Sequence, residues 1–296
     1  MSPGKASGQK NEHMSHQEAQ NPGIEEHGPQ QALPGVPIRG EGEQGCSRAE
    51  RLSRELGFPI LQEVPDRLHL VAGASSLFVC GRLPGEEGRR TPPYMCPDLS
   101  RLDISSGPGR CKDQPLLKAI LGRKKGYGRV VYDLTAGLGE DAWILSASGC
   151  SLVAVERDPV IFALLRDALA RAGIEGQVLA RRIHLVHAQA QDLLLSSARR
   201  KELLLPQPDV LYMDPFFVSE RRRRGMQKRS MRILRWIGEQ EAPGDSQDLL
   251  DAGMRSRAGR VVLKRPRHST PLNSRYGPRI HAVQGRGFRF DIYQPF

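Results

Sequence analysis

Short apolar runs alternate with amphipathic stretches through the second half of the chain. The runs predict strands at 130–134, 151–156, 183–187, 209–213 and 261–266. Between the first four runs, apolar positions at helical spacing predict helices at 140–148, 159–172 and 190–203. Strands and helices that alternate in this way predict a parallel sheet with helices on both faces. Two last runs, 280–284 and 288–293, flank Gly-Arg-Gly and predict a terminal hairpin.

The first third of the chain has a weaker pattern. Residues 1–50 are rich in Gly, Pro, Gln and Glu and lack periodic apolar positions, which predicts a disordered tail. Residues 51–111 predict a small β-rich region, and residues 112–296 predict the main domain. The smaller elements expected before the main sheet are a helix at 49–56, a hairpin over 64–79, a turn-rich stretch at 81–97, a strand at 99–104, a loop at 105–110 and a helix from Pro115.

A glycine loop joins the first predicted strand to its helix. The loop runs from Thr135 to Gly139 and contains Gly137, so the backbone can approach a ligand closely. Glu156 ends the next predicted strand, about 20 residues past the glycines, where an acid can bind the two hydroxyls of a ribose. The pattern therefore predicts a cofactor that contains adenosine. A plain strand and helix with ordinary capping acids is the alternative.

The acids that follow the loop indicate which adenosine cofactor binds. Glu140 and Asp141 begin the helix at the place where a nicotinamide dinucleotide would put its pyrophosphate. Two carboxylates suit the helix dipole and a cationic ligand, and they repel a pyrophosphate. S-adenosylmethionine carries an amino group and a sulfonium, so the loop favours a methyltransferase over a dehydrogenase.

The strand at 209–213 ends in Asp-Pro-Phe-Phe, where ligands of such sheets bind. This sequence resembles the Asp/Asn-Pro-Pro-Tyr/Phe signature of enzymes that methylate exocyclic amines of bases. Asp214 can accept a hydrogen bond from such an amine, and Pro215 can fix a backbone carbonyl for its other hydrogen. Phe216, or Phe217 beside it, can stack on the base for about 1–3 kcal/mol. A strand end with a turn proline and two core phenylalanines is the alternative.

Six segments in this order resemble the ribosomal RNA small subunit methyltransferase J family from about Leu116 to Tyr293. They are DLTAGLGEDAW, VERDPV, IHLVHA, YMDPFF, VVLKRP and FRFDIY. The resemblance implies a class I S-adenosylmethionine-dependent methyltransferase with an α/β, Rossmann-like sheet, a C-terminal antiparallel hairpin and a small N-terminal β-rich appendage. It also implies methylation of a guanine N2 amine in 16S ribosomal RNA. By position, it implies cofactor contacts at Glu140, Asp141, Glu156, Arg157, Gln189, Ala190 and Asp214.

The charge of the chain is +11, and the bases are clustered. Eight bases and one acid lie at 220–235, where a basic helix is expected at 221–237 before an acidic loop at 238–246. Ten bases and no acid lie at 255–289. Clusters of one sign favour a polyanion over a solvated face. We predict that RNA contacts involve Arg222, Arg223, Lys264 and Arg265. Lys264 and Arg265 could hold an RNA phosphate or the target base, and a salt bridge at the rim of the site is the equal alternative.

The cysteines, the histidines and the absence of long apolar runs bear on metal binding and on the compartment in which the protein acts. The five cysteines, Cys46, Cys80, Cys96, Cys111 and Cys150, form no Cys-x-x-Cys pair, so neither a zinc site nor a disulfide framework is expected. We expect no metal, and we read His184 and His187 as structural. No apolar run is long enough to span a membrane, and the thiols suit a reducing cytoplasm.

The combined prediction is a cytoplasmic enzyme that moves a methyl group from S-adenosylmethionine to a guanine N2 amine in small-subunit ribosomal RNA. Asp214 would hold the amine and Phe216 would stack on the base. Two alternatives stay open, namely an N-methyltransferase acting on an amine of DNA or protein, and a non-catalytic RNA-binding module. The sequence indicates neither the oligomeric state nor a role for the first 50 residues.

Overall fold

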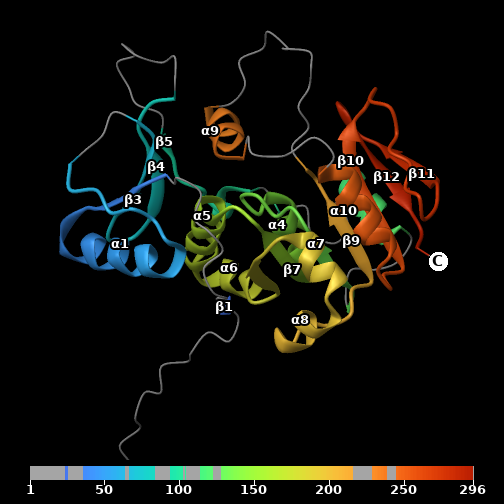
Figure 1. Cartoon of the computed structure of the whole chain (residues 1–296), viewed down its shortest axis with the longest axis horizontal. Helices are drawn as coiled ribbons and strands as arrows, with labels where there is room; N and C mark the ends of the chain where they lie inside the picture. Colours follow the sequence, from blue (N-terminus) through green and yellow to red (C-terminus); the bar gives the residue numbers. More distant parts are fainter. Residues whose placement is uncertain are drawn as a thin grey trace, which may run out of the picture.

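A mixed sheet forms the centre of the molecule (Figure 1). The computed structural model describes residues 24–25, 36–63, 67–83, 94–102, 104, 114–122, 128–215, 229–238 and 245–295. Among these residues the sheet has eight strands in the order β1-β8-β7-β6-β9-β10-β12-β11. Its strands are β1 (Ile24–Glu25), β6 (Val130–Asp133), β7 (Ser151–Glu156), β8 (Ile183–His187), β9 (Val210–Met213), β10 (Arg260–Pro266), β11 (Arg279–Gln284) and β12 (Phe288–Tyr293). Strand β12 runs antiparallel to both β10 and β11, so the predicted terminal hairpin is confirmed.

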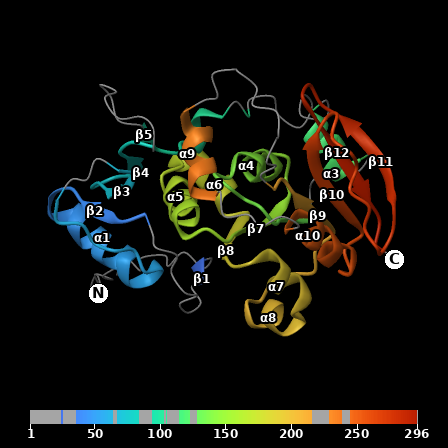
Figure 2. The ribbon, with the colours of Figure 1, turned by 45° about the horizontal axis from the view of Figure 1, so that its top comes forward.

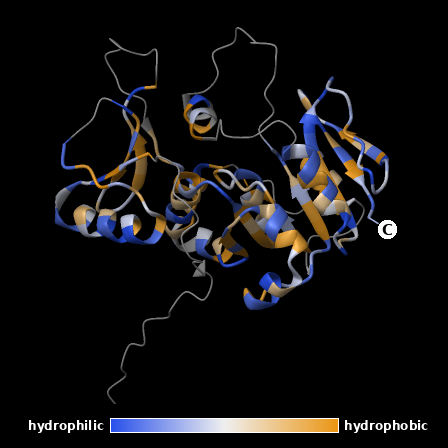
Figure 3. Cartoon of the chain, viewed as in Figure 1, coloured by the Kyte–Doolittle hydropathy of each residue, from blue (hydrophilic) through white to orange (hydrophobic). Residues whose placement is uncertain are grey.

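Helices cover both faces of the sheet, as its continuously buried central strands require. On one face, Trp143 of α4 (Glu140–Ala147) and Phe162 of α5 (Pro159–Ala170) pack over Val131 and Tyr212. The same core takes in α3 (Pro115–Leu121), and α6 (Gly173–Ala180) packs against α4 and α5. The other face buries apolar side chains of α7 (Ala190–Leu195) and α10 (Asp245–Met254), while α8 (Ser197–Glu202) follows α7. Figure 3 shows the apolar strands enclosed by helices of mixed polarity.

The N-terminal region is a second, smaller sheet packed on α5. Its strands are β2 (Ile38–Gly40), β3 (His69–Ala72), β4 (Leu77–Cys80) and β5 (Tyr94–Met95), with α1 (Gly42–Leu56) beside them. The third core joins this sheet to α5 and to α9 (Arg229–Gly238), which lies over them in Figure 2. Helix α5 therefore buries one stripe against the main sheet and another against the N-terminal sheet.

Asp167 of α5 binds the N-terminal region to the helix that packs on the main sheet. Its buried carboxylate accepts hydrogen bonds from the Leu77 backbone N–H at 3.0 Å and from Arg171 Nε at 2.7 Å, and it pairs with Arg48 of α1. A buried charge is tolerated only when it is paired and hydrogen-bonded, and Asp167 meets both conditions. The N-terminal sheet is thus held on α5 by charge as well as by apolar packing.

Several predicted boundaries were wrong. Residues 36–50 are folded, because β2 and most of α1 lie there, so the tail does not extend to residue 50. The predicted strand at 99–104 contains a 3-10 helix, Leu99–Arg101, which Asp98 caps by accepting the Ser100 N–H. The predicted helix 190–203 is broken at Ser196, whose hydroxyl accepts a hydrogen bond from the Arg199 N–H and caps α8.

Two helices were not anticipated. Helix α6 begins at Gly173, whose φ of 71° turns the chain after α5, and α10 begins at Asp245 inside the stretch predicted to be an acidic loop. Of the predicted basic helix at 221–237, the part from Arg229 is confirmed, and residues 221–228 lie outside the described residues. The loop at 105–110 and the predicted domain boundary at 111–112 also lie outside them.

Candidate functional site

A cavity of about 580 Å³ lies at the carboxyl ends of the parallel strands. Residues from the ends of β6 to β10 line it, together with the starts of α4, α5, α7 and α10. Leu56 of α1 and two residues of α9, Leu234 and Ile237, complete its wall. Ligands of such sheets bind at this edge, and the volume is in the range of small-molecule sites.

The glycine loop forms one wall because two of its residues have a left-handed backbone. Gly137 has φ 54° and Gly139 has φ 80°. A methyl group on Gly139 would come within 2.4 Å of Leu165 Cδ1, so this glycine allows the loop to pack on α5. A methyl group on Gly137 would meet nothing closer than the Thr135 carbonyl oxygen at 3.9 Å. Gly137 lines the cavity, so its missing side chain leaves room there.

The two glycines should respond differently to alanine. We expect Gly137→Ala to lose about 1–2 kcal/mol of unfolding free energy, since only the left-handed backbone is strained. Gly139→Ala should lose about 2–5 kcal/mol, because overpacking against Leu165 adds to the same strain. Chemical denaturation would measure both losses of stability. Calorimetry with S-adenosylhomocysteine would measure cofactor affinity, and the ratio of lost affinity to lost stability should be larger for Gly137→Ala than for Gly139→Ala. Equal effects of the two variants on stability would contradict this reading.

Glu156 connects the loop to the end of β7. One oxygen accepts the Gly137 N–H at 2.9 Å and the other accepts the Asp158 N–H at 2.8 Å. Burial raises the pKa of Glu156 to about 7, although these two hydrogen bonds oppose the rise. An ionised carboxylate has about four lone-pair sites. No other donor among the described residues contacts Glu156, so within them each oxygen retains one site for a further donor. Two free acceptor sites on one carboxylate match the two hydroxyls of a ribose.

A second group of acids surrounds Lys264 of β10. Lys264 Nζ lies 2.7 Å from Asp214 Oδ2 and 3.3 Å from Asp141 Oδ2. Asp141 Oδ2 also accepts a hydrogen bond from the Tyr212 hydroxyl at 2.5 Å. The Asp214 backbone N–H donates to Thr135 Oγ1 at 2.6 Å, which links this residue to the glycine loop. Among the described residues, no donor contacts Asp214 Oδ1, so one oxygen of this carboxylate is available.

The electrostatics of the group depend on burial and on the single lysine. Asp133, at the end of β6, is fully buried, and burial together with the nearby Asp141 charge raises its pKa well above the ordinary value. Burial also raises the pKa of Asp214, whereas Lys264 lowers it. Burial alone would lower the pKa of Lys264, but Asp214 and Asp141 raise this pKa by more than burial lowers it. Lys264 therefore remains charged. The carboxylates that line the cavity outnumber its lysine, which suits a cationic ligand.

The predicted cofactor residues come together in this cavity. Its lining includes Gly137, Gly139, Glu140, Asp141, Glu156, Arg157, Gln189, Ala190 and Asp214. Arg157 Nη1 forms an ion pair with Asp245 of α10 at 3.1 Å. Phe216, Phe217, Arg222 and Arg223 lie outside the described residues. Lys264 lies within the site, whereas Arg265 donates to the Thr270 carbonyl oxygen at 2.9 Å and does not line the cavity.

Sequence reasoning missed several residues of the site. Asp133 could have been singled out, because an acid inside an apolar strand is unusual. Tyr212 gave no signal, since a tyrosine in a strand is ordinary. His187 lines the cavity, with Nε2 3.1 Å from the Arg157 carbonyl oxygen and its ring stacked on Phe162. Burial lowers the pKa of His187, which favours the neutral ring that these packing contacts need.

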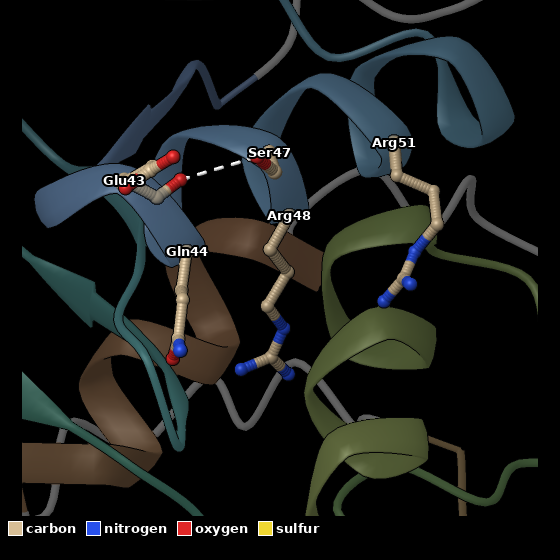
Figure 4. Close-up of a pocket in the computed structure, with 5 residues that line it drawn as sticks. All are labelled: Glu43, Gln44, Ser47, Arg48 and Arg51. Atoms are coloured by element: carbon tan, nitrogen blue, oxygen red, sulfur yellow. Dashed lines mark hydrogen bonds between the residues drawn. The ribbon is translucent and has the colours of Figure 1, made fainter.

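A second hollow of about 500 Å³ lies beside α1 (Figure 4). Its lining residues are Glu43, Gln44, Ser47, Arg48 and Arg51. Arg48 pairs with Asp167, and Arg51 Nε lies 3.7 Å from Glu55 Oε1. Arg48 thus joins α1 to α5, and Arg51 pairs within α1, so both arginines have structural partners and the chemistry is assigned to the cavity at the strand ends.

Among the residues that the structure describes, no helix is long and apolar enough to cross a bilayer. In the same ranges, no three His, Cys, Asp or Glu side chains are grouped so that they could hold a metal ion.

Comparison with known proteins gives consistent results. A family model described as "Putative SAM-dependent methyltransferase" matches residues 104–295. The Ribosomal RNA small subunit methyltransferase J of Thioalkalivibrio sulfidiphilus is 33% identical over 264 residues, which cover 87% of this chain and 97% of that protein. The protein of the same name from Cellvibrio japonicus is 34% identical over 251 residues, which cover 83% and 92%.

A solved structure supports the fold. The crystal structure of the SAM-dependent methyltransferase NGO1261 from Neisseria gonorrhoeae superposes with a TM-score of 0.58 at 24% identity, and it covers 88% of this chain and 96% of that one. The predicted fold class and the predicted cofactor, S-adenosylmethionine, are confirmed. By its family model and these relatives, the chain belongs to the ribosomal RNA small subunit methyltransferase J family of S-adenosylmethionine-dependent methyltransferases.

Proposed function

We propose that the protein methylates the exocyclic N2 amine of a guanine in 16S ribosomal RNA, and therefore acts in the cytoplasm. The observation that carries this proposal is the position of Asp214. It follows β9 at the rim of the cofactor cavity, its Oδ2 is held by Lys264, and its Oδ1 accepts no hydrogen bond from the described residues. A carboxylate oxygen in this position can hold an incoming amine. The printed name of the relatives supports ribosomal RNA as the substrate.

The residues of the cavity fit S-adenosylmethionine. Glu156 would bind the ribose hydroxyls through the two acceptor sites that its backbone contacts leave free. Glu140 and Asp141 would face the positively charged part of the cofactor, and Gln189 and Ala190, on the loop after β8, would border the adenosine. A pyrophosphate would meet several carboxylates here, which disfavours a dinucleotide. When bound, the cofactor supplies a methyl group on a positively charged sulfur.

The protein's own contribution is to position the amine. A guanine amine is a poor nucleophile because its lone pair is delocalised into the ring. Asp214 Oδ1 would accept one N–H of the amine and favour a tetrahedral nitrogen, while a backbone carbonyl beside Pro215 accepts the other. The nitrogen would take the methyl group as the carbon–sulfur bond of the cofactor breaks, and Asp214 Oδ1, which accepts the N–H, would take the proton that the amine then loses and pass it to solvent. Holding the two reactants in this geometry removes a large part of the activation barrier to methyl transfer.

A labelled-cofactor assay tests the proposal. Purified RNA, DNA and protein would each be incubated with the enzyme and radiolabelled S-adenosylmethionine, and we expect label in small-subunit ribosomal RNA. Mass spectrometry of the RNA from cells that lack the protein should show one unmethylated guanine N2. Label in protein or DNA alone would mean another amine substrate. Failure to bind S-adenosylhomocysteine would favour a non-catalytic RNA-binding module.

Cofactor binding should depend on pH through Glu156. Its pKa is raised to about 7 by burial, so below pH 7 the free protein carries a growing fraction of protonated Glu156. Ribose hydroxyls need the ionised form as acceptor, so affinity should fall about tenfold for each pH unit below 7 and level off above it. Calorimetry with S-adenosylhomocysteine between pH 5.5 and 8.5 measures this. Glu156→Gln should bind more weakly and lose this pH dependence, and a flat profile for the unaltered protein would contradict the role.

A further inference from the structure

The tip of the C-terminal hairpin lies at the same edge of the sheet as the site. Pro266 ends β10 and pairs with Phe288 at the start of β12, so the turn at 285–287 lies beside the loop that follows β10. The Arg267 N–H donates to the Gly287 carbonyl oxygen at 3.3 Å, which joins the two turns. Lys264, which contacts Asp214, lies three residues before Arg267, or roughly 10 Å along a strand.

Three exposed bases extend from these turns, and we call Arg267, His268 and Arg286 the hairpin-tip surface. The sequence contains no acid between Lys264 and Phe290. Asp291, the acid nearest in the sequence, is fully buried and already bound to Arg279 and Arg289. Among the described residues, no ion pair involves any of the three bases. A solvated protein face normally mixes both signs of charge, and this one does not.

The loop that carries Arg267 and His268 is held by a buried cation. Arg289 is 4% exposed and binds both oxygens of Asp291, at 2.7 and 3.0 Å. Its remaining donors reach the carbonyl oxygens of Pro266 at 3.2 Å and Arg267 at 2.7 Å. Ser269 Oγ also donates to the Pro266 carbonyl oxygen, and Arg265 to that of Thr270. A loop ordered before binding loses less entropy when it engages a ligand.

Glycine and aromatic packing fix the second turn in the same way. A methyl group on Gly285 would overlap the ring of Phe288 at 2.3 Å, so only glycine allows this turn to lie on that ring. Phe288 packs edge-on against Phe290, with ring centroids 5.3 Å apart. Lys264 Nζ lies 5.3 Å from the centroid of the Phe288 ring. The turn that carries Arg286 therefore packs on the Phe288 ring, which also contacts Lys264 of the site.

We propose that the hairpin-tip surface binds phosphates of the substrate RNA next to the nucleotide presented to Asp214. Preordered cations at a fixed distance from the reacting carboxylate would set the position of the strand. A base inside folded RNA must leave its stack to reach the cavity, and contacts to flanking phosphates offset part of that cost. The inference rests on the proposed function, because it assumes that RNA is the substrate. Lys264 and Arg265, which were predicted to contact RNA, bind partners within the protein. The inference therefore assigns the RNA contact to the exposed bases of the hairpin-tip surface.

A pair of double variants tests the inference. Arg267→Gln with Arg286→Gln removes two charges at the tip. Arg181→Gln with Arg257→Gln removes two exposed charges just before β8 and β10, at the opposite edge of the sheet, and is the matched control. Affinity for a transcript of small-subunit ribosomal RNA would be measured over a salt series. Calorimetry with S-adenosylhomocysteine would show that each variant keeps its fold and cofactor site.

At about 0.1 M salt we expect the tip variant to bind RNA roughly 10- to 50-fold more weakly, with a salt slope smaller by about 2. The control should change affinity by less than about threefold and keep its slope. Cofactor affinity should be unchanged in both, and the tip variant should show a raised KM for RNA with a nearly unchanged kcat. Equal RNA affinity in the tip variant and the control would overturn the inference. If the unaltered protein methylated no RNA, the proposed function itself would fail.

Discussion

Replacing Asp214 by alanine is expected to lower kcat by roughly 10³-fold while RNA affinity stays nearly unchanged. The variant removes the acceptor that would hold the amine in the transition state, and groups in that role contribute about 10²- to 10⁴-fold. RNA affinity should persist because it depends on phosphate contacts elsewhere. Single-turnover methylation at saturating cofactor measures the first effect, and a binding assay with the same RNA measures the second.

Asp214→Asn is the informative companion of that variant. Asparagine has nearly the same shape and keeps one acceptor oxygen, but it has no charge to pair with Lys264. We expect a smaller loss than for alanine, on the order of tenfold to a hundredfold. Parallel loss of RNA affinity and turnover in both variants would mean that Asp214 is structural. Turnover close to that of the unaltered enzyme in the alanine variant would remove Asp214 from the mechanism.

The main sheet and the glycine loop could be predicted because their signals are local. A run of apolar residues such as Val130 to Leu134 fits a strand buried on both faces, and the glycines that follow fit a tight turn. Acids at the carboxyl ends of parallel strands converge on one edge, so Glu156 and Asp214 could be assigned to one cavity without knowing the contacts.

The start of α1 could not be predicted because the residues that it buries there have very small side chains or none. Gly45 and Ala49 form the buried stripe with Leu52, and a methyl group on Gly45 would come within 2.3 Å of the Ala72 carbonyl oxygen. Close packing of this kind requires small residues, whereas periodicity of large apolar residues is the signal that a sequence displays. Strand β2, which precedes α1, has only three residues and is too short to display a period.

The pairing of Lys264 was hidden for a different reason. Lys264 and Asp214 are 50 residues apart, and they meet because Leu263 is aligned with Met213 in the parallel pair of β9 and β10. Strand register depends on the whole sheet and is not encoded by a local pattern. The sequence therefore left an RNA contact and a salt bridge open for Lys264, and the structure places its Nζ 2.7 Å from Asp214 Oδ2.

Replacing Lys264 by methionine should make turnover strongly dependent on pH. Lys264 opposes the rise in the pKa of Asp214 that burial and the Asp141 carboxylate cause. Without the lysine the pKa rises further, so more of Asp214 is protonated at neutral pH, and a protonated carboxyl cannot accept the amine hydrogen as well. Because the acid loses its proton as pH increases, activity should recover toward high pH.

We expect turnover of Lys264→Met, relative to the unaltered enzyme, to be lower at pH 6.5 than at pH 9, since each unit of pKa changes the ionised fraction up to tenfold. Lys264→Arg keeps the charge and should retain most of the normal pH profile. Tyr212→Phe removes the other donor to Asp141 without touching the bond between Lys264 and Asp214, so its effect should be small and independent of pH. A structural role for Lys264 predicts instead the same fractional loss at every pH, because a misfolded site does not regain its shape when one carboxyl ionises.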